Sequence, residues 1–154
     1  MRESNRLLRY KICLQPQDVT MATLKISDLS VGDWVQNDYG DYVKVAGIWQ
    51  GSNFNYHVDI RRNGVIGTIL PCNLHPIPIT AEILEKNGFE KNGEYNEWST
   101  GNWDDIPFIG ISLSRQSMRI KNLGTDIFIE NKVVYVHQLQ RALSLANIDK
   151  EITL

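Results

Sequence analysis

The side chains best suited to chemistry are few and scattered along the chain. His57 and Asp59 lie two residues apart in a run of alternating apolar residues, so they share one face of a predicted strand. A carboxylate in that position can orient an imidazole for general-base catalysis, but no nucleophile stands nearby in a recognisable setting. A solvated strand face explains the pair better, and no catalytic residue is predicted.

Metal-binding patterns are incomplete. Cys72 and His75 have the spacing of half a zinc site, but no second pair of ligands accompanies them. A later loop gathers acidic side chains in a spacing that matches no calcium loop: Glu94, Glu97, Asp104 and Asp105. We therefore predict no metal and no cofactor. The chain also has no phosphate loop, dinucleotide fingerprint or nucleophile elbow, so an enzyme without a linear signature is only an alternative.

Aromatic residues give the leading candidate for a binding site. Trp98 and Trp103 bracket four small or polar residues that end at Asn102. Large rings in a loop gain contact area at low entropic cost, and loops often carry function. We predict that Trp98, Asn102 and Trp103 bind a ligand, with the alternative that both rings fold back onto the sheet.

The C-terminal helix offers a second candidate surface. His137, Gln138 and Gln140 lie off the apolar stripe and form an amide-rich face with few charges, which suits a protein interface. The alternative is that these side chains make hydrogen bonds to loops of the same domain.

A basic ridge supports a different function. Arg115, Arg119 and Lys121 occupy odd positions in a predicted hairpin, and Arg61 with Arg62 adds two further cations. Such a ridge can contact a phosphate backbone even when the whole domain carries no net positive charge. The isoelectric point near 5.9 counts against nucleic-acid binding, which remains the alternative function.

Composition indicates an ordinary folded protein. Among 154 residues, 42% are hydrophobic and 22% charged, and the formal net charge is -2, which excludes a disordered chain and a strong attraction to polyanions. No apolar run approaches the roughly 20 residues of a membrane span, and residues 1–14 lack the apolar core and cleavage site of a secretory signal, so we expect no export. We expect a cytoplasmic protein with Cys13 and Cys72 reduced, a mobile tail over residues 1–20 and a single α+β domain over 21–154.

The first half of that domain has the pattern of an antiparallel meander. Strands are predicted at 33–37, 42–49, 54–60 and 65–70, with the last pair turning at Asn63-Gly64. Alternation in the second strand places Val43, Val45 and Trp49 in the core. These short strands predict a curled sheet or SH3-like barrel.

The second half combines helices with further strands. After a proline-rich surface connector at 71–78, a helix over 81–87 is capped by Thr80 and ended by Gly88. Periodicity then predicts more strands and a terminal amphipathic helix: 106–113, 118–123, 126–130, 132–135 and 136–147. With no linker or repeat between them, the halves are expected to share one core.

A resemblance to a known family rests on three stretches. They are Asp33-Trp-Val, Pro78-Ile-Thr-Ala-Glu-Ile-Leu-Glu-Lys-Asn-Gly-Phe-Glu and Val133-Val-Tyr-Val-His-Gln-Leu-Gln. They resemble a widespread family of short uncharacterised proteins from gut-anaerobe genomes and their phage-like elements. The chain departs from the family pattern at Arg141, where the family has Asn, and in the ending 148–154. The family has no assigned activity, so the resemblance implies a phage or mobile-element context and no residue role.

The sequence as a whole predicts a mainly antiparallel α+β fold and a function that does not involve catalysis. The expected function is a binding or adaptor module that contacts another protein. Nucleic acid is the alternative partner, no membrane is expected, and the sequence does not indicate an oligomeric state.

Overall fold

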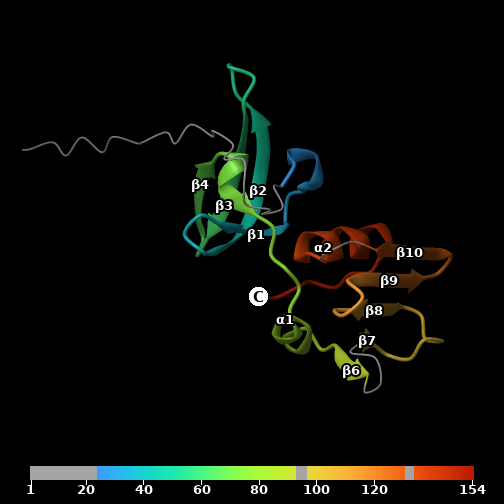
Figure 1. Cartoon of the computed structure of the whole chain (residues 1–154). Coiled ribbons are helices and arrows are strands. Elements are labelled where there is room, and N and C mark those ends of the chain that lie inside the picture. Colours follow the sequence, from blue (N-terminus) through green and yellow to red (C-terminus); the bar gives the residue numbers. More distant parts are fainter. Residues whose placement is uncertain (1–23, 93–96, 131–133) are drawn as a thin grey trace, which may run out of the picture.

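A computed structural model describes residues 24–92, 97–130 and 134–154. It contains two five-stranded antiparallel sheets and two α-helices (Figure 1). The expected α+β class with mainly antiparallel β-structure is therefore confirmed. The predicted tail at residues 1–20 lies outside the described residues. No helix in the described part of the chain is long and apolar enough to cross a membrane.

The N-terminal sheet has the strand order β4-β3-β2-β1-β5, with every described neighbouring pair antiparallel. Two short 3-10 helices, η1 (Ile26–Asp28) and η2 (Pro71–Asn73), flank its meander. The strand bounds are β1 (Trp34–Asn37), β2 (Tyr42–Gln50), β3 (Tyr56–Arg62), β4 (Val65–Ile69) and β5 (Leu74–His75). The four predicted strands of the meander are thus present.

The turn between β3 and β4 follows directly from its residues. Asn63 and Gly64 have φ values of 49° and 81°, the left-handed conformation that a two-residue hairpin turn requires. Asparagine and glycine tolerate this conformation best. The predicted Asn-Gly hairpin is confirmed.

One core residue of β2 was predicted wrongly. Val43 and Val45 are buried, but Trp49 is 45% exposed. The cause is a β-bulge between Val45 and Gly47, where the pairing with β3 shifts by one residue. Because side chains alternate along a strand, the extra residue turns Ile48 toward the core and Trp49 away from it.

The proline-rich segment 71–78 is more than a surface connector. Leu74 in β5 pairs along the edge of β1, and both Leu74 and Ile77 are buried. The prolines lie outside this edge strand, with Pro71 at the start of η2 and Pro78 in an isolated bridge with Tyr135. Cys72, in η2, is disulfide-bonded, so the expectation of a reduced thiol is wrong at this position. Cys13 lies outside the described residues.

The C-terminal sheet has the order β10-β9-β8-β7-β6, again antiparallel throughout its described pairs. Its strands are β6 (Glu90–Asn92), β7 (Glu97–Thr100), β8 (Phe108–Ser112), β9 (Ser117–Asn122) and β10 (Thr125–Glu130). The predicted strand at 132–135 falls largely outside the described residues, and Tyr135 forms an isolated bridge with Pro78.

Both predicted helices are present. In α1 (Ala81–Lys86), the Thr80 hydroxyl accepts a hydrogen bond from the Ile83 backbone N–H at 3.3 Å, and Gly88 follows the helix with φ 74°. The terminal helix α2 (Val136–Leu145) buries its apolar stripe against the C-terminal sheet. The Thr80 cap and the amphipathic C-terminal helix are confirmed.

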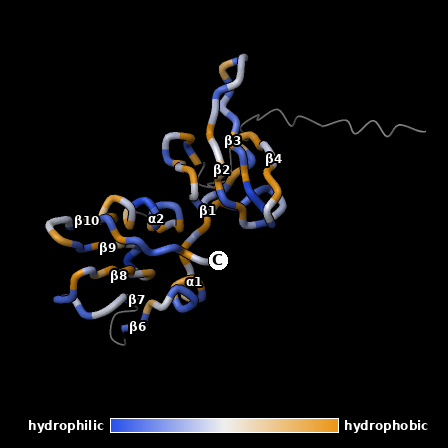
Figure 2. Tube along the Cα trace, turned by 180° about the vertical axis from the view of Figure 1, so that it is seen from behind, coloured by the Kyte–Doolittle hydropathy of each residue, from blue (hydrophilic) through white to orange (hydrophobic). Residues whose placement is uncertain are grey.

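The expected shared core is replaced by two apolar clusters, one for each sheet. Figure 2 shows hydrophobic stretches in both halves. Polar contacts connect the halves: the Gln140 side chain of α2 accepts from the Trp34 backbone N–H at 2.9 Å and donates to the Gly32 carbonyl at 3.2 Å. The Trp34 indole also donates to the Ile152 carbonyl at 2.8 Å. Each sheet therefore has its own apolar interior, and the junction is held by these hydrogen bonds and by the Trp34 side chain, which also packs against the C-terminal cluster.

Candidate functional site

The predicted aromatic loop is divided between a strand and a loop. Trp98 lies on β7, pairs with Ile111 of β8 and is only 4% exposed within the C-terminal core. The prediction of an exposed binding ring is wrong for Trp98, because strand alternation turns this side chain inward. Trp103 follows the strand in the loop to β8 and is 49% exposed.

Contacts with the sheet hold the exposed Trp103 ring in place. Its centroid is 5.1 Å from that of Phe108, in an edge-to-face arrangement. Lys121 Nζ lies 3.6 Å from the Trp103 ring centroid, and the Arg119 guanidinium carbon lies 4.7 Å from it. Edge-to-face pairing and cation–π contacts are both attractive, so the sheet orients the ring before any partner arrives.

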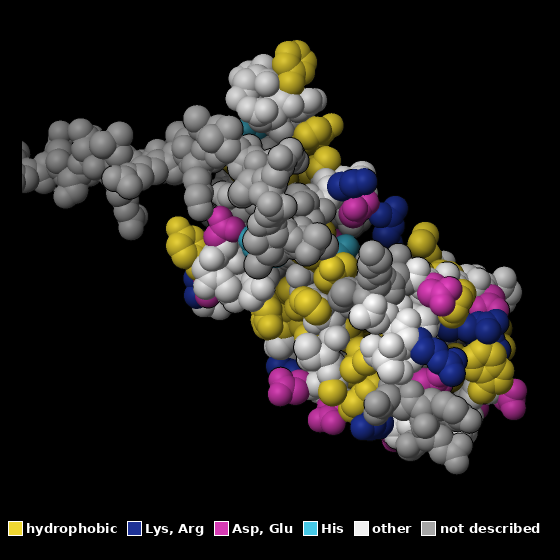
Figure 3. All heavy atoms as spheres, in the orientation of Figure 1, with side chains coloured by type: hydrophobic (Ala, Val, Ile, Leu, Met, Phe, Trp, Pro, Cys, Tyr) yellow, Lys and Arg dark blue, Asp and Glu magenta, His cyan; other side chains and the backbone are white. Residues whose placement is uncertain are grey.

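A pocket of about 390 Å³ lies beside Trp103 on the outer face of the C-terminal sheet. Its lining includes Asn102, Trp103, Phe108, Gly110 and Glu97. A Cβ atom at Gly110 would lie 2.9 Å from the Phe108 ring, so a larger residue there would require this ring to shift. Figure 3 shows large hydrophobic side chains beside basic and acidic ones in this half of the molecule. All three predicted loop residues therefore line one depression, with Trp103 exposed at it and Trp98 contributing from its buried position on β7.

The loop itself is tied by an acidic side chain. The Asp105 carboxylate accepts a hydrogen bond from the Asn102 backbone N–H at 2.6 Å. Gly101, directly before Asn102, has φ 81°, a conformation that glycine adopts without strain. The short loop is therefore held by the Asp105 side chain, and it presents Trp103 at a fixed place.

Sequence reasoning missed three contributors to this surface: Phe108, Gly110 and Phe128. Phe128 is exposed on β10 and pairs across the strands with Arg119. The signal that could have found Phe108 and Phe128 is alternation. Both residues share the outward register of Arg119 and Lys121, which the basic-ridge prediction had already placed outside.

The predicted face of the C-terminal helix is not an open interface. Gln138 Oε1 accepts from the Tyr135 backbone N–H at 3.0 Å in a capping box, and Gln140 joins the two halves of the chain. His137 is 5% exposed. The alternative interpretation holds for Gln138 and Gln140, whose amides bond to nearby backbone within the same chain.

His137 is a buried and incompletely bonded side chain. Its Nδ1 atom has no hydrogen-bond partner among the described residues, and its ring stacks on Tyr135 at 5.8 Å between centroids. Burial lowers the pKa of His137 below its ordinary value, with Arg141 adding to the effect and Asp28 opposing it. The neutral imidazole is therefore favoured in the folded protein.

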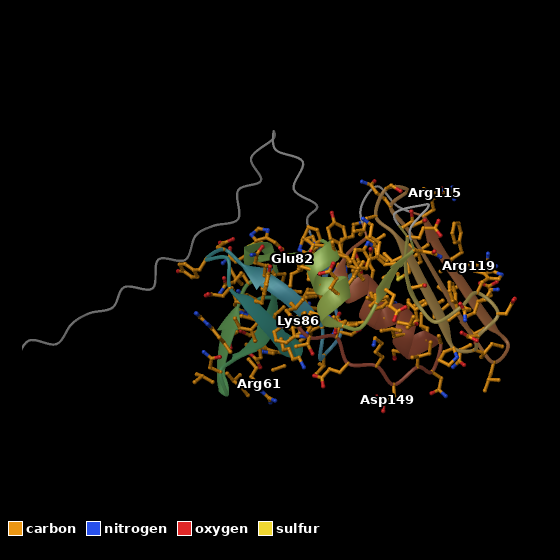
Figure 4. All side chains as sticks on the ribbon, turned by 90° about the horizontal axis from the view of Figure 1, so that it is seen from below. Arg61, Glu82, Lys86, Arg115, Arg119 and Asp149 are labelled. Carbon is orange, nitrogen blue, oxygen red and sulfur yellow. The ribbon has the colours of Figure 1, made fainter. Side chains whose placement is uncertain are left out.

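The predicted basic ridge is largely neutralised and does not form one surface. Arg119 makes a bidentate ion pair with Asp126, at 2.9 and 2.6 Å, and Arg62 pairs with Asp41 at 2.6 Å. Arg115 lies 3.9 Å from Glu97. In Figure 4, Arg61 lies on the opposite side of the molecule from Arg115 and Arg119. The ion pairs among the described residues include neither Arg61 nor Lys121.

The His57 and Asp59 side chains contact neighbouring residues of the same sheet and not each other's functional groups in a catalytic arrangement. The His57 ring stacks on Trp49 at 4.4 Å, whereas the Asp59 carboxylate accepts from Thr68 Oγ1 at 2.7 Å and Trp49 Nε1 at 3.2 Å. These hydrogen bonds, that of Thr68 first, lower the pKa of Asp59. Asp59 thus orients Thr68 and Trp49.

A larger cleft, of about 660 Å³, lies between the turn at Ser30–Asp33 and the end of α2 with the residues that follow it. Asp33 is buried here, and its carboxylate accepts from the Ser30 backbone N–H at 2.7 Å. Burial raises the pKa of Asp33, while that hydrogen bond and Arg141 oppose the rise. The Asp33 carboxylate therefore stabilises the turn that precedes β1.

Within the described ranges, no group of three His, Cys, Asp or Glu side chains is placed to hold a metal ion. His75 Nε2 is instead bonded to Asp38 at 2.7 Å. Comparisons of the chain with protein-family models, with curated proteins and with solved structures find no match. The candidate site therefore has to be judged on its own chemistry.

Proposed function

We propose that the protein is a non-enzymatic binding or adaptor module that contacts another protein through the outer face of the C-terminal sheet, around Trp103. The observation that carries the proposal is a half-exposed tryptophan, fixed by Phe108, Arg119 and Lys121 at the rim of a pocket. Tryptophan and arginine are the residue types most enriched among energetic hot spots of protein interfaces.

Preorganisation adds to this argument. A side chain that is already held by its neighbours loses little conformational entropy on binding, so more of the contact energy appears as affinity. Phe128 extends the apolar area beyond Trp103 on the same face, across from Arg119. The surface thus combines rigid rings with charged groups at their borders, as interface cores and rims do.

Selection from a displayed random-peptide library on the immobilised full chain tests the proposal. Affinity of the selected peptides is then measured by titration calorimetry. Trp103→Ala is expected to weaken binding by about tenfold or more, the size of a hot-spot loss. Trp49→Ala is the matched control, because Trp49 is similarly exposed on the other sheet. Equal affinity of the Trp103→Ala variant and the original chain would contradict the proposal.

Nucleic-acid binding remains the alternative, with less support. Arg62, Arg115 and Arg119 each have an acidic neighbour, so few cations are free to release counterions from a phosphate backbone. A salt titration of oligonucleotide binding separates the two functions. Phosphate contacts make affinity fall steeply with salt, whereas an apolar protein contact changes little.

Three finer features belong to the same proposal. The return of β5 to β1 after the 3-10 turn η2 supports an SH3-like barrel for the N-terminal sheet. The family resemblance supports a phage or mobile-element context.

A cytoplasmic location is the third feature of the proposal. The disulfide at Cys72 is evidence against this location, because disulfides are rare in reducing compartments.

A further inference from the structure

β4 forms one outer edge of the N-terminal sheet, and within residues 24–92, 97–130 and 134–154 no strand pairs with that edge. On its other side, β4 pairs with β3. Val65 and Ile66 are 70% and 56% exposed. At such an edge, unpaired backbone N–H and C=O groups offer a template for another strand.

The composition of β4 does nothing to block that pairing. Its sequence, Val-Ile-Gly-Thr-Ile, has no charged residue and no proline, and it is rich in β-branched side chains. Figure 2 shows hydrophobic residues along this outer strand. The long edge of the other sheet differs, because β10 carries the exposed acids Asp126 and Glu130. Charged residues are a usual means of protecting an edge, and β4 has none.

The strand is also nearly symmetric about Gly67. In an antiparallel pair of two β4 strands centred on Gly67, Val65 would oppose Ile69 of the second copy, and Ile66 would oppose Thr68. Each cross-strand pair then joins two β-branched side chains, which pack well on a sheet. A twofold interface requires a surface complementary to itself, and this sequence has that property.

Charges on the neighbouring strand are compatible with the same register. Asp59 pairs with Thr68, and Arg61 pairs with Ile66, so both charges stand on the face shared by these β4 residues. No ion pair among the described residues involves Asp59 or Arg61. In the Gly67-centred arrangement, one row across four strands contains Asp59 and Thr68 of one copy, followed by Ile66 and Arg61 of the other copy. Each such row therefore has a carboxylate at one end and a guanidinium at the other. A shift of the pairing centre to Ile66 or Thr68 would instead place like charges at both ends.

From these observations we propose that two copies of the chain associate through β4, paired antiparallel about Gly67, to form one continuous ten-stranded sheet. The occupant of the β4 edge is thus a second copy of this chain. The association uses the N-terminal sheet and leaves the Trp103 surface free, so it does not depend on the proposed binding function.

Sedimentation equilibrium of the full chain, from micromolar to millimolar concentration, tests the association. The mass is expected to rise from the 17.6 kDa of one chain toward twice that value. Ile66→Lys places a charge in the edge and is expected to raise the dissociation constant by about tenfold or more. Leu123→Lys, at another exposed apolar position, is the control and should leave it unchanged. A single chain at all concentrations, or a dimer indifferent to Ile66→Lys, overturns the proposal.

Cross-linking tests the register separately. A Cβ atom added at Gly67 would meet no other atom within 4 Å, and the residue has no left-handed φ, so Gly67→Cys fits the strand. Directly opposite residues of an antiparallel pair have Cβ atoms about 4.5–5.5 Å apart, near the range of a disulfide. Mild oxidation of Gly67→Cys is expected to give a covalent dimer, with Leu123→Cys as the control. A dimer that forms no Gly67 cross-link overturns the Gly67-centred pairing.

Discussion

At the scale of single residues, two tryptophans five positions apart have opposite roles. Trp98 packs inside the C-terminal core, whereas Trp103 stands half-exposed at a pocket rim. The residue types alone do not distinguish them, because both indoles can serve either purpose. The deciding factor is whether the residue lies in the alternation of a strand or in the loop after it.

Substitution of the two rings by alanine separates these roles. Trp98→Ala is expected to lower the free energy of unfolding by about 3–5 kcal/mol, because it removes a large buried ring and leaves a cavity. Trp103→Ala is expected to change it by about 1 kcal/mol or less. Urea denaturation followed by far-ultraviolet circular dichroism measures both. Similar losses in the two variants would contradict the assignment of Trp98 to the core.

His137 makes stability depend on pH. Its pKa is lowered in the folded protein, so between pH 7 and pH 5 the unfolded chain binds protons that the folded chain does not. Stability is therefore full above the unfolded pKa of about 6.5 and falls as the pH drops below it. Comparison of His137→Gln with the original chain by urea denaturation at each pH isolates this contribution.

The His137→Gln variant should show a smaller loss of stability between pH 7 and pH 5. Asp28 and Arg141 are retained in both proteins, so the difference reports the imidazole and not its charged neighbours. An equal loss in the two proteins would show that another group causes the pH dependence.

At the scale of elements, local chemistry predicted more than long-range packing did. The Asn63-Gly64 turn and the Thr80 cap depend on a few adjacent residues, and both are present. The bulge at Val45 and Gly47 depends on how β2 meets β3, and although a glycine inside a strand is typical of a bulge, Gly47 alone does not determine which side chains it turns outward. The outward orientation of Trp49, which was predicted to face the core, follows from that one extra residue.

In the candidate site, too, local sequence predicted some residues, whereas long-range strand pairing determined the others. Asn102 and Trp103 could be selected from sequence because they lie in a short polar and aromatic stretch. Phe108 and Phe128 become part of the surface only after β8, β9 and β10 are paired in register. Likewise, the burial of His137 could not be read from its helix, since it depends on packing with distant segments.

At the scale of the whole molecule, each half has its own apolar cluster, and the junction combines hydrogen bonds with the Trp34 side chain, which packs against the C-terminal cluster. Gln140 connects α2 to Trp34 and Gly32, and the Trp34 indole reaches the Ile152 carbonyl. Lys44 also pairs with Glu151. The contact between the halves therefore depends on a few directional bonds together with the packing of Trp34 against the C-terminal cluster.

Removal of the central amide should uncouple the halves. Gln140→Ala leaves the Trp34 N–H without its acceptor, and we expect a loss of about 1–3 kcal/mol, the cost of an unmade hydrogen bond in a partly buried place. Unfolding followed by tryptophan fluorescence and by circular dichroism should then no longer coincide. Gln138→Ala, which removes a bond inside the helix cap, is the control. Coincident transitions for Gln140→Ala would indicate that the halves unfold together without this contact.

The hydrogen bond from Trp34 to Ile152 also constrains the order of folding events. It joins residues 118 positions apart, whereas the hairpins of each sheet close over a few residues. Short loops close rapidly, and contacts between distant residues form later because more chain entropy must be lost first. During synthesis, residues 148–154 leave the ribosome after both sheets, so we expect the hydrogen bond between Trp34 and Ile152 to form after them.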